Sequence, residues 1–241
     1  TFYQSNLLRE YMKIVIVTDL HYMKTKQEGC PDRVGERANE LLTAVIEKVN
    51  TEIKPDILLG CGDLINNPND YELLVELANT LDKTQCPKII IPGNHDPEPN
   101  IFYQNIERPP LYMDVKGFRF LPFPDDKQTA GYNAFRSAED IERIKALGSD
   151  KRTILVQHVP LYSPLTIKCE YNYDNADEII SACKNVVLSI SGHEHTGYFP
   201  SFKSPFPVII APALCEVRFP FLEVDLNVDG KIDAFKLHYV G

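Results

Sequence analysis

The chain has 241 residues, of which 44% are hydrophobic, and it carries a formal net charge of −9. This length suits one large domain or two small ones, and such a chain can bury a stable core without cross-links. The acidic balance argues against sequence-independent binding of nucleic acid, which needs a basic surface. The longest apolar runs span about half a dozen residues, against the ~20 of a membrane helix, so we expect a cytoplasmic protein without a membrane partner.

The leading residues 1–11, TFYQSNLLREY, precede Met12 and lack the apolar core of a secretory signal. We interpret them as an N-terminal extension or a vector remnant. The remainder, 12–241, contains no internal repeat and no Gly/Ser-rich linker, so we expect a single domain.

Short apolar runs and amphipathic stretches alternate along most of the chain. Five runs rich in Ile, Val and Leu lack strict alternation, which is typical of strands covered on both faces: 13–19, 56–63, 88–96, 152–158 and 186–193. Helical periodicity predicts helices over 33–53, 69–83, 137–147 and 175–184. Asn69, with Glu72 three residues on, and Ser137 are the candidate helix caps.

The C-terminal part differs, because strands follow one another there with little helix between them. Strand patterns cover 206–214, 221–227 and 231–240, with Asp229-Gly230 marking a hairpin turn, and 118–124 is a further candidate. Alternating strands and helices predict an α/β protein. We expect a mixed sheet, or two sheets packed face to face, with helices outside.

The six cysteines form no C-x-x-C pair, and in a chain with a full core they are expected to be reduced, mostly buried thiols. They are Cys30, Cys61, Cys86, Cys169, Cys183 and Cys215.

Polar side chains follow all five apolar runs at the point where each run ends. In chain order they are Asp19 and His21, then Asp63, then Asn94, His95 and Asp96, then His158, and last His193 and His195. Ligands of open α/β sheets bind outside the carboxyl ends of the strands, so these residues are expected to share one site.

The donor types in this set predict a metal centre. Imidazole, carboxylate and an amide oxygen suit Mn, Fe, Zn or Co and require no thiolate. The set is too large for one ion and suits two divalent transition-metal ions that share a carboxylate. In hydrolytic sites, paired ions of this kind clamp the attacking and leaving oxygens of an in-line displacement.

The motifs resemble those of the calcineurin-like metallophosphoesterases. The family pattern D-x-H, GD, GNH(D/E), a lone His and GH-x-H is matched by DLH (19–21), GD (62–63), GNHD (93–96), QH (157–158) and GHEH (192–195). The resemblance spans about 180 residues, and every motif is intact. It implies a four-layer αββα sandwich with two mixed β-sheets flanked by helices.

The resemblance also implies a role for each residue. One metal would be bound by Asp19, His21 and His195, the other by Asn94, His158 and His193, with Asp63 bridging them. A metal-bridging hydroxide would attack the phosphorus. His95 would stabilise the transition state or protonate the leaving alkoxide, and Asp96 would orient the His95 imidazole.

The substrate class is less well determined by the sequence. The stretches around GDL and GNHD and the C-terminal tail are similar to class III cyclic-nucleotide phosphodiesterases, which favours a small phosphodiester or nucleotide substrate. A phosphomonoesterase or nuclease of the same superfamily, a non-catalytic scaffold with this fold, and homo-oligomers all stay open. Loop tyrosines could stack on a base, or could simply pack their own loops: Tyr22, Tyr103, Tyr162, Tyr171 and Tyr173.

Overall fold

The computed structural model describes residues 11–26, 31–148, 150–163, 171–201 and 204–241. Residues 1–10, most of the leading segment, lie outside the described residues, as do Cys30 and Cys169. The cysteines in the described ranges are free thiols, as expected: Cys61, Cys86, Cys183 and Cys215.

The first sheet has five strands in the order β13-β12-β1-β2-β3. Their bounds are β1 (Met12–Val17), β2 (Ile57–Cys61), β3 (Lys88–Ile91), β12 (Pro220–Leu226) and β13 (Ile232–Tyr239). Strands β1, β2 and β3 run parallel, whereas β12 pairs antiparallel with both β1 and β13. This sheet is therefore mixed, and its antiparallel edge is the C-terminal hairpin expected from the sequence.

The second sheet has six strands in the order β10-β11-β9-β8-β5-β4. Their bounds are β4 (Met113–Val115), β5 (Phe118–Pro122), β8 (Arg152–Val156), β9 (Val186–Ser191), β10 (Tyr198–Ser201) and β11 (Val208–Ile210). The four central strands are parallel and the two edge strands are antiparallel. A small hairpin, β6 (Lys127–Gln128) and β7 (Ala134–Phe135), stands apart from both sheets.

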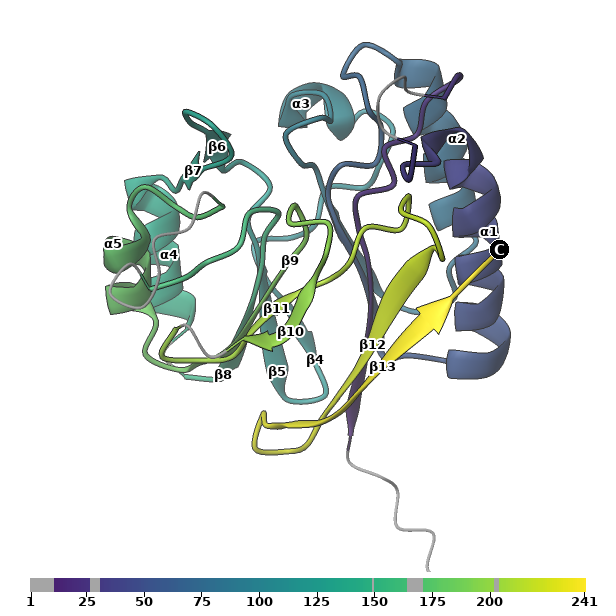
Figure 1. Ribbon diagram of the computed structural model, residues 1–241. Coiled ribbons are helices and arrows are strands. Elements are labelled where there is room, and N and C mark those ends of the chain that lie inside the picture. The colour runs from purple at the N-terminus through teal and green to yellow at the C-terminus, as the bar shows by residue number, and fades with distance from the viewer. Residues whose placement is uncertain (1–10, 27–30, 149, 164–170, 202–203) are drawn as a thin grey trace, which may run out of the picture.

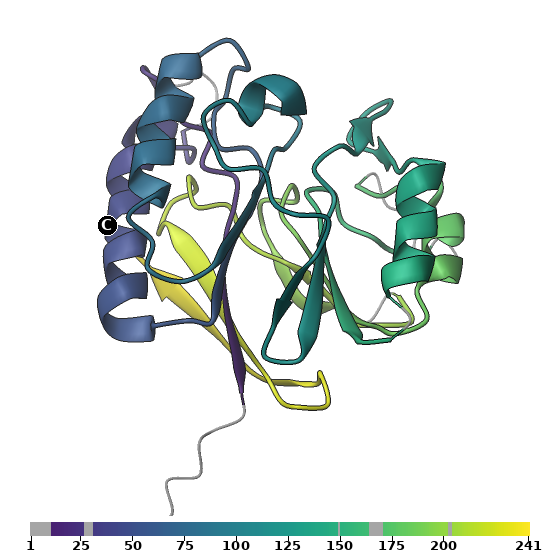
Figure 2. The same ribbon diagram turned by 180° about the vertical axis from the view of Figure 1, so that it is seen from behind.

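Helices cover the outer face of each sheet, which confirms the four-layer αββα architecture (Figure 1). Helices α1 (Ala38–Lys48) and α2 (Tyr71–Leu81) flank the first sheet, and α4 (Ala138–Leu147) and α5 (Ala176–Ala182) flank the second. The short α3 (Pro99–Phe102) lies above the sheets. Seen from behind, α3 and the β6–β7 hairpin again stand on opposite sides of the space above the strands (Figure 2).

Three apolar layers explain why the strands show no strict alternation. In β1, Ile14 and Ile16 belong to the core between the two sheets, together with Phe120 of β5. Val15 and Val17 point the other way, into the core under α1 and α2. A third core lies between the second sheet and helices α4 and α5. Burial of each such side chain contributes about 1.5–3 kcal/mol, so both faces of a central strand must be apolar.

Helix ends differ in places from the sequence-based expectation. The helix expected over 33–53 is a 3₁₀ turn (Gly35–Arg37), α1, and a wide π turn (Val49–Ile53) that ends at Lys54, where φ is 50°. The Ser137 cap is confirmed, since the backbone N–H of Asp140 donates to its hydroxyl at 3.1 Å.

The prediction that Asn69 caps the second long helix is wrong. Helix α2 begins after Asp70, which makes no side-chain cap. The backbone N–H of Asn69 instead donates to the side-chain oxygen of Asn67 at 3.2 Å. Such local side-chain-to-backbone bonds compete with capping, and here the loop turn wins.

Across the described ranges, no helix has the length and apolar character needed to cross a membrane. The carboxyl ends of β1, β2, β3, β8 and β9 all lie at the upper edge of the sheets in Figure 1. The polar residues that follow these strands are therefore brought to one rim.

Candidate metal centre

The seven ligands expected from the sequence converge at this rim. Two groups of donor atoms form there, and one carboxylate oxygen of Asp63 belongs to both. Both sheets contribute, because Asp19, His21, Asp63 and Asn94 follow strands of the first sheet, and His158, His193 and His195 follow strands of the second.

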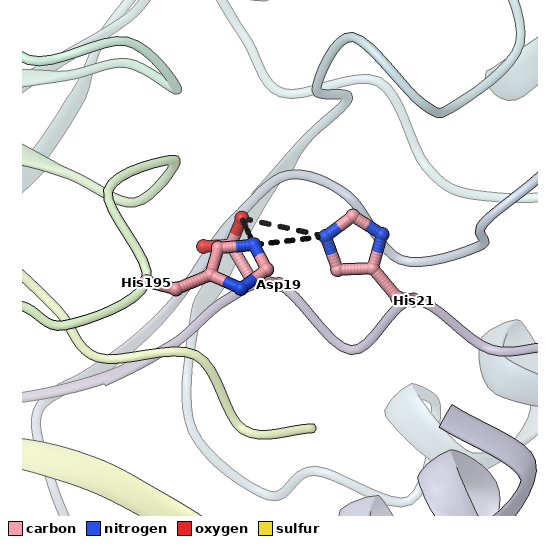
Figure 3. Close-up of side chains that lie close together, drawn as sticks. All are labelled: Asp19, His21 and His195. Carbon is pink, nitrogen blue, oxygen red and sulfur yellow. Dashed lines mark hydrogen bonds and ion pairs between the residues drawn. The ribbon is translucent and has the colours of Figure 1, made fainter. Parts of the chain in front are cut away.

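The first group consists of Asp19 and His21, which follow β1, and His195, which follows β9 (Figure 3). The Nε2 atoms of His21 and His195 lie 3.1 Å apart, and they lie 3.9 and 3.5 Å from Oδ1 of Asp19. Oδ2 of Asp63 is 3.5 Å from Nε2 of His21. Two ligands that each sit ~2.1 Å from an ion are about 3–3.5 Å apart, so this spacing suits a shared cation.

The second group lies on the other side of Asp63. Nε2 of His158 is 3.0 Å from Oδ1 of Asn94, 3.1 Å from Nδ1 of His193 and 3.4 Å from Oδ2 of Asp63. Because Oδ2 of Asp63 is near both His21 and His158, it is placed to bridge two ions. The other Asp63 oxygen, Oδ1, accepts the backbone N–H of His95 at 2.8 Å.

In the second group, the imidazole rings of His158 and His193 each use one nitrogen for a hydrogen bond to a backbone carbonyl. Their other nitrogens face each other. Nδ1 of His158 bonds the carbonyl of Cys61 at 2.7 Å, and Nε2 of His193 bonds the carbonyl of Tyr132 at 2.9 Å. A carbonyl only accepts, so each ring carries a proton there, and in the neutral rings Nε2 of His158 and Nδ1 of His193 present lone pairs. Together with the oxygens of Asn94 and Asp63, four acceptors converge on one point, which fits a cation.

The first group passes the same test. Oδ2 of Asp19 accepts from the Thr18 hydroxyl at 2.7 Å and from the backbone N–H of His193 at 3.0 Å. Oδ1 of Asp19 is fully buried and has no hydrogen-bond partner. An orphaned buried carboxylate oxygen is costly unless a cation compensates it, so the residues present fit a metal pair.

Charges within the cluster shift the pKa values of its members. Burial lowers the pKa of His21 and of His193 to about 3. Burial acts in the same direction on His158, but the charge and hydrogen bond of Asp63 outweigh it and raise the pKa to about 9. Burial alone would raise the pKa of the Asp63 carboxyl, yet His158 and His21 hold it well below its usual range. The Asp63 carboxylate therefore favours positive charge on the side of the cluster where His158 lies.

The backbone around the donors is strained and tightly packed. Asp19, His21, Asp63 and His193 all have positive φ, between 45° and 70°. Such conformations are uncommon for residues other than glycine and concentrate at functional sites. They turn each side chain sharply off the end of its strand and into the rim.

Glycines in the motifs make room for the donors. A β-carbon on Gly93 would lie 2.3 Å from Oδ1 of Asp63, and one on Gly192 would lie 2.0 Å from the Thr18 hydroxyl oxygen and 2.5 Å from Oδ2 of Asp19. These close approaches explain why glycine precedes Asn94 and His193.

His95 lies beside the first group. Its ring packs edge-on against His21 with centroids 4.7 Å apart, and its Nδ1 is 3.0 Å from the carbonyl of Asn66. A ring nitrogen of His95 lies within 4.8 Å of donor atoms of His21 and Asp63.

The expectation that Asp96 orients the His95 imidazole is wrong. The Asp96 carboxylate accepts the backbone N–H groups of Leu64, Ile65 and Gly93 at 3.1, 2.9 and 2.9 Å. It therefore ties the loop after β2 to the loop after β3, and the Asn66 carbonyl orients His95 instead. Burial raises the pKa of Asp96 to about 7.

Sequence reasoning missed Glu216, whose Oε1 is 2.9 Å from Nδ1 of His195. Glu216 reaches this position because its segment pairs with the loop after β1, through a bridge to Arg33 and a bond from the Val34 N–H to the Cys215 carbonyl at 2.8 Å. A carboxylate on the far nitrogen of a ligand histidine fixes its tautomer and orientation. Glu216 comes two residues after the strand pattern over 206–214, but it belongs to none of the five motifs, so only the fold identifies its contact with His195.

A cleft of about 710 Å³ opens beside the second group, large enough for a small molecule. Asn94 and His158 are among its lining residues, and the others include 97–100, 123–128 and Ala134. Carboxylates of Glu98, Asp125 and Asp126 make this lining polar.

The loop tyrosines expected near the site have different environments. Tyr162 and Tyr173 are 2% and 3% exposed, so they pack within the protein. Tyr22 donates to Glu76 at 2.6 Å, and Tyr103 donates to the Ile90 carbonyl at 3.2 Å. Tyr171 stacks on Tyr132, which sequence reasoning did not select.

Comparison with known proteins places these motifs among related sequences. The model of a family described as calcineurin-like phosphoesterase matches residues 12–197. A probable cyclic nucleotide phosphodiesterase of Coxiella burnetii is 27% identical over 234 residues, which cover 91% of this chain and 90% of that protein. A probable cyclic nucleotide phosphodiesterase of Xenorhabdus bovienii is 23% identical, covering 77% and 79% of the two chains.

Solved structures agree in fold. A dimetal phosphatase from Danio rerio superposes with a TM-score of 0.71 at 14% identity, covering 90% of this chain and 93% of that one. At this identity the likeness bears on the fold alone.

Proposed function

Because this chain belongs to the calcineurin-like phosphoesterase family and is a metal-dependent phosphoester hydrolase, we propose that it cleaves small phosphodiesters, with cyclic nucleotides as the first substrate class. The observation that carries the proposal is the pair of converging donor groups that share Oδ2 of Asp63. The similarity to proteins named as probable cyclic nucleotide phosphodiesterases supports the diester preference.

The ligand sets are part of this proposal. Asp19, His21 and His195 would hold one ion, Asn94, His158 and His193 would hold the other, and Asp63 would be shared by both. Nitrogen and oxygen donors suit Mn, Fe or Zn. When bound, such a pair makes water nucleophilic near neutral pH and neutralises charge on the phosphate oxygens.

His95 supplies the proton for the leaving oxygen. Its Nδ1–H donates to the Asn66 carbonyl, which fixes the ring and leaves Nε2 as the atom that exchanges the proton. As the P–O bond to the leaving group breaks, the proton on Nε2 passes to the departing oxygen. Asp96 supports this step indirectly, because it holds the loop that carries His95.

The test compares hydrolysis of bis(p-nitrophenyl) phosphate, p-nitrophenyl phosphate and cyclic AMP after loading with Mn²⁺. We expect higher kcat/KM for diesters than for the monoester. His95→Ala and His95→Asn should both lose about 10²–10⁴-fold in kcat, the usual contribution of general acid catalysis. Asn can keep the bond to the Asn66 carbonyl, so it controls for loop disorder.

Metal content of both variants should equal that of the wild type. A preference for the monoester would overturn the substrate proposal and favour a phosphomonoesterase. Full activity of His95→Asn would refute the role of His95.

A further inference from the structure

Two tyrosines form a flat aromatic pair at the edge of the candidate metal centre. The rings of Tyr132 and Tyr171 stack with centroids 5.0 Å apart and an interplanar angle of 24°. Both rings meet the imidazole of His193 edge-on, at 6.1 Å for Tyr132 and 5.4 Å for Tyr171. The pair is therefore next to a metal-ligand candidate and on a different loop from it.

The two segments that carry the pair are fastened together. The backbone N–H of Asn172 donates to the side chain of Asn133 at 3.2 Å, and the N–H of Ala134 donates to the Asn172 carbonyl at 3.0 Å. The Asn133 amide donates to Asp174 at 2.8 Å. The Tyr132 carbonyl accepts from Nε2 of His193 at 2.9 Å. Backbone contacts hold Tyr132 in place, so its ring can be replaced without removing its anchor.

Exposure separates Tyr132 from its neighbours. It is 52% exposed, whereas Tyr162 and Tyr173 of adjoining loops are almost fully buried. A large ring held in water beside an active site gains little for folding, but it offers a surface to a flat ligand. The cleft over Asn94 and His158 is lined by carboxylates, and the one aromatic residue among its lining residues, Phe123, is only 2% exposed.

We propose that Tyr132, backed by Tyr171, is a stacking platform for the base of a nucleotide whose phosphate lies at the metal centre. This subsite rests on the proposed function and names the part of the substrate that it selects. Stacking accepts any purine or pyrimidine, because every base has a π face, so the platform favours nucleotides over phosphodiesters without an aromatic group.

Competition experiments isolate the contribution of the base. AMP and ribose 5-phosphate are compared as inhibitors of bis(p-nitrophenyl) phosphate hydrolysis, since they differ only in the base. Stacking of one base on an aromatic side chain typically strengthens binding about tenfold or more, so AMP should inhibit that much more tightly. Tyr132→Ala should weaken the binding of AMP but not that of ribose 5-phosphate, so the two inhibition constants should become similar. Tyr132→Phe should preserve the difference, and Tyr71→Ala, an exposed tyrosine on α2, is the matched control.

A second readout does not depend on turnover. The chain contains no tryptophan, so Tyr132→Trp introduces a single indole fluorophore. AMP should quench its emission at concentrations at which ribose 5-phosphate does not.

Failure of this proposal is distinguishable from failure of the proposed function. The platform is refuted if the wild type hydrolyses diesters but Tyr132→Ala weakens the binding of AMP and of ribose 5-phosphate equally. It is also refuted if the variant weakens the binding of neither compound. If no diester is hydrolysed, the proposed function fails, while quenching of Tyr132→Trp by AMP still decides the platform.

Discussion

His195 is held on both sides of its ring by groups from distant parts of the chain. Nε2 lies 3.5 Å from Oδ1 of Asp19, and Nδ1 lies 2.9 Å from Glu216. A carboxylate that accepts a hydrogen bond from Nδ1 keeps that nitrogen protonated, so Nε2 carries the lone pair that can bind a cation. We therefore propose that Glu216 acts on the metal centre through His195.

Replacing Glu216 should weaken metal binding without unfolding the protein. Loss of such a partner typically costs 10–100-fold in metal affinity, so we expect Glu216→Ala to lose that much affinity for at least one ion. Glu216→Gln should lose less, because its amide oxygen can still accept from Nδ1. Isothermal titration calorimetry with Mn²⁺ measures the affinity of both variants. Glu107→Ala, which removes an exposed loop carboxylate, is the control. Unchanged affinity in Glu216→Ala would contradict this role.

At the scale of elements, sharp turns after short parallel strands build the site. Spacing in the sequence predicts which donors follow each strand, because parallel strands bring their carboxyl ends to one edge. It does not predict the contacts of Asp96 or the position of Glu216, since these depend on how separate loops meet. Tyr132 was missed for the same reason: its only marker is proximity to His193, created by the fold.

Gly93→Ala tests the close packing of these turns. Its β-carbon would collide with Asp63, so the loop or the bridging carboxylate must move. We expect loss of bound metal and at least a tenfold loss of kcat/KM, because misplaced ligands act on the chemistry directly.

Gly117→Ala is the informative comparison. Its β-carbon meets nothing within 4 Å, but its φ is 81°. It should cost about 1–2 kcal/mol of stability and leave metal content unchanged. Equal metal content in the two variants, measured by mass spectrometry, would show that packing at Gly93 is not critical.

At the scale of the whole molecule, the metal centre joins the two sheets. Each donor group draws histidines or carboxylates from both, so bound ions would connect layers that also meet through apolar packing and through bonds such as that from Nδ1 of His158 to the Cys61 carbonyl. The periodicity of the apolar runs predicted these layers, since a strand covered on both faces must be apolar on both. The exact helix ends, such as the π turn before Lys54, could not be predicted, because helix periodicity does not resolve one extra residue per turn.

Metal loading should therefore raise thermal stability. Ligand at 100 times its Kd stabilises the folded state by about 2.7 kcal/mol, which corresponds to a Tm increase of roughly 5–10 °C for a chain of this length. Scanning calorimetry with Mn²⁺ and with EDTA measures the difference. Asp63→Asn, which disturbs both groups, should show a much smaller shift. Identical Tm values for the wild type in Mn²⁺ and EDTA would exclude this coupling.

The order of the donors along the chain has a consequence for biosynthesis. Asp19 and His21 leave the ribosome before His195, which follows β9, is 174 residues beyond His21 and completes the first donor group. Until then the nascent polypeptide lacks one member of the first donor group. We therefore expect both metals to be in place only after His195 has been synthesised, and growth medium supplied with the metal late in expression should suffice to yield loaded protein.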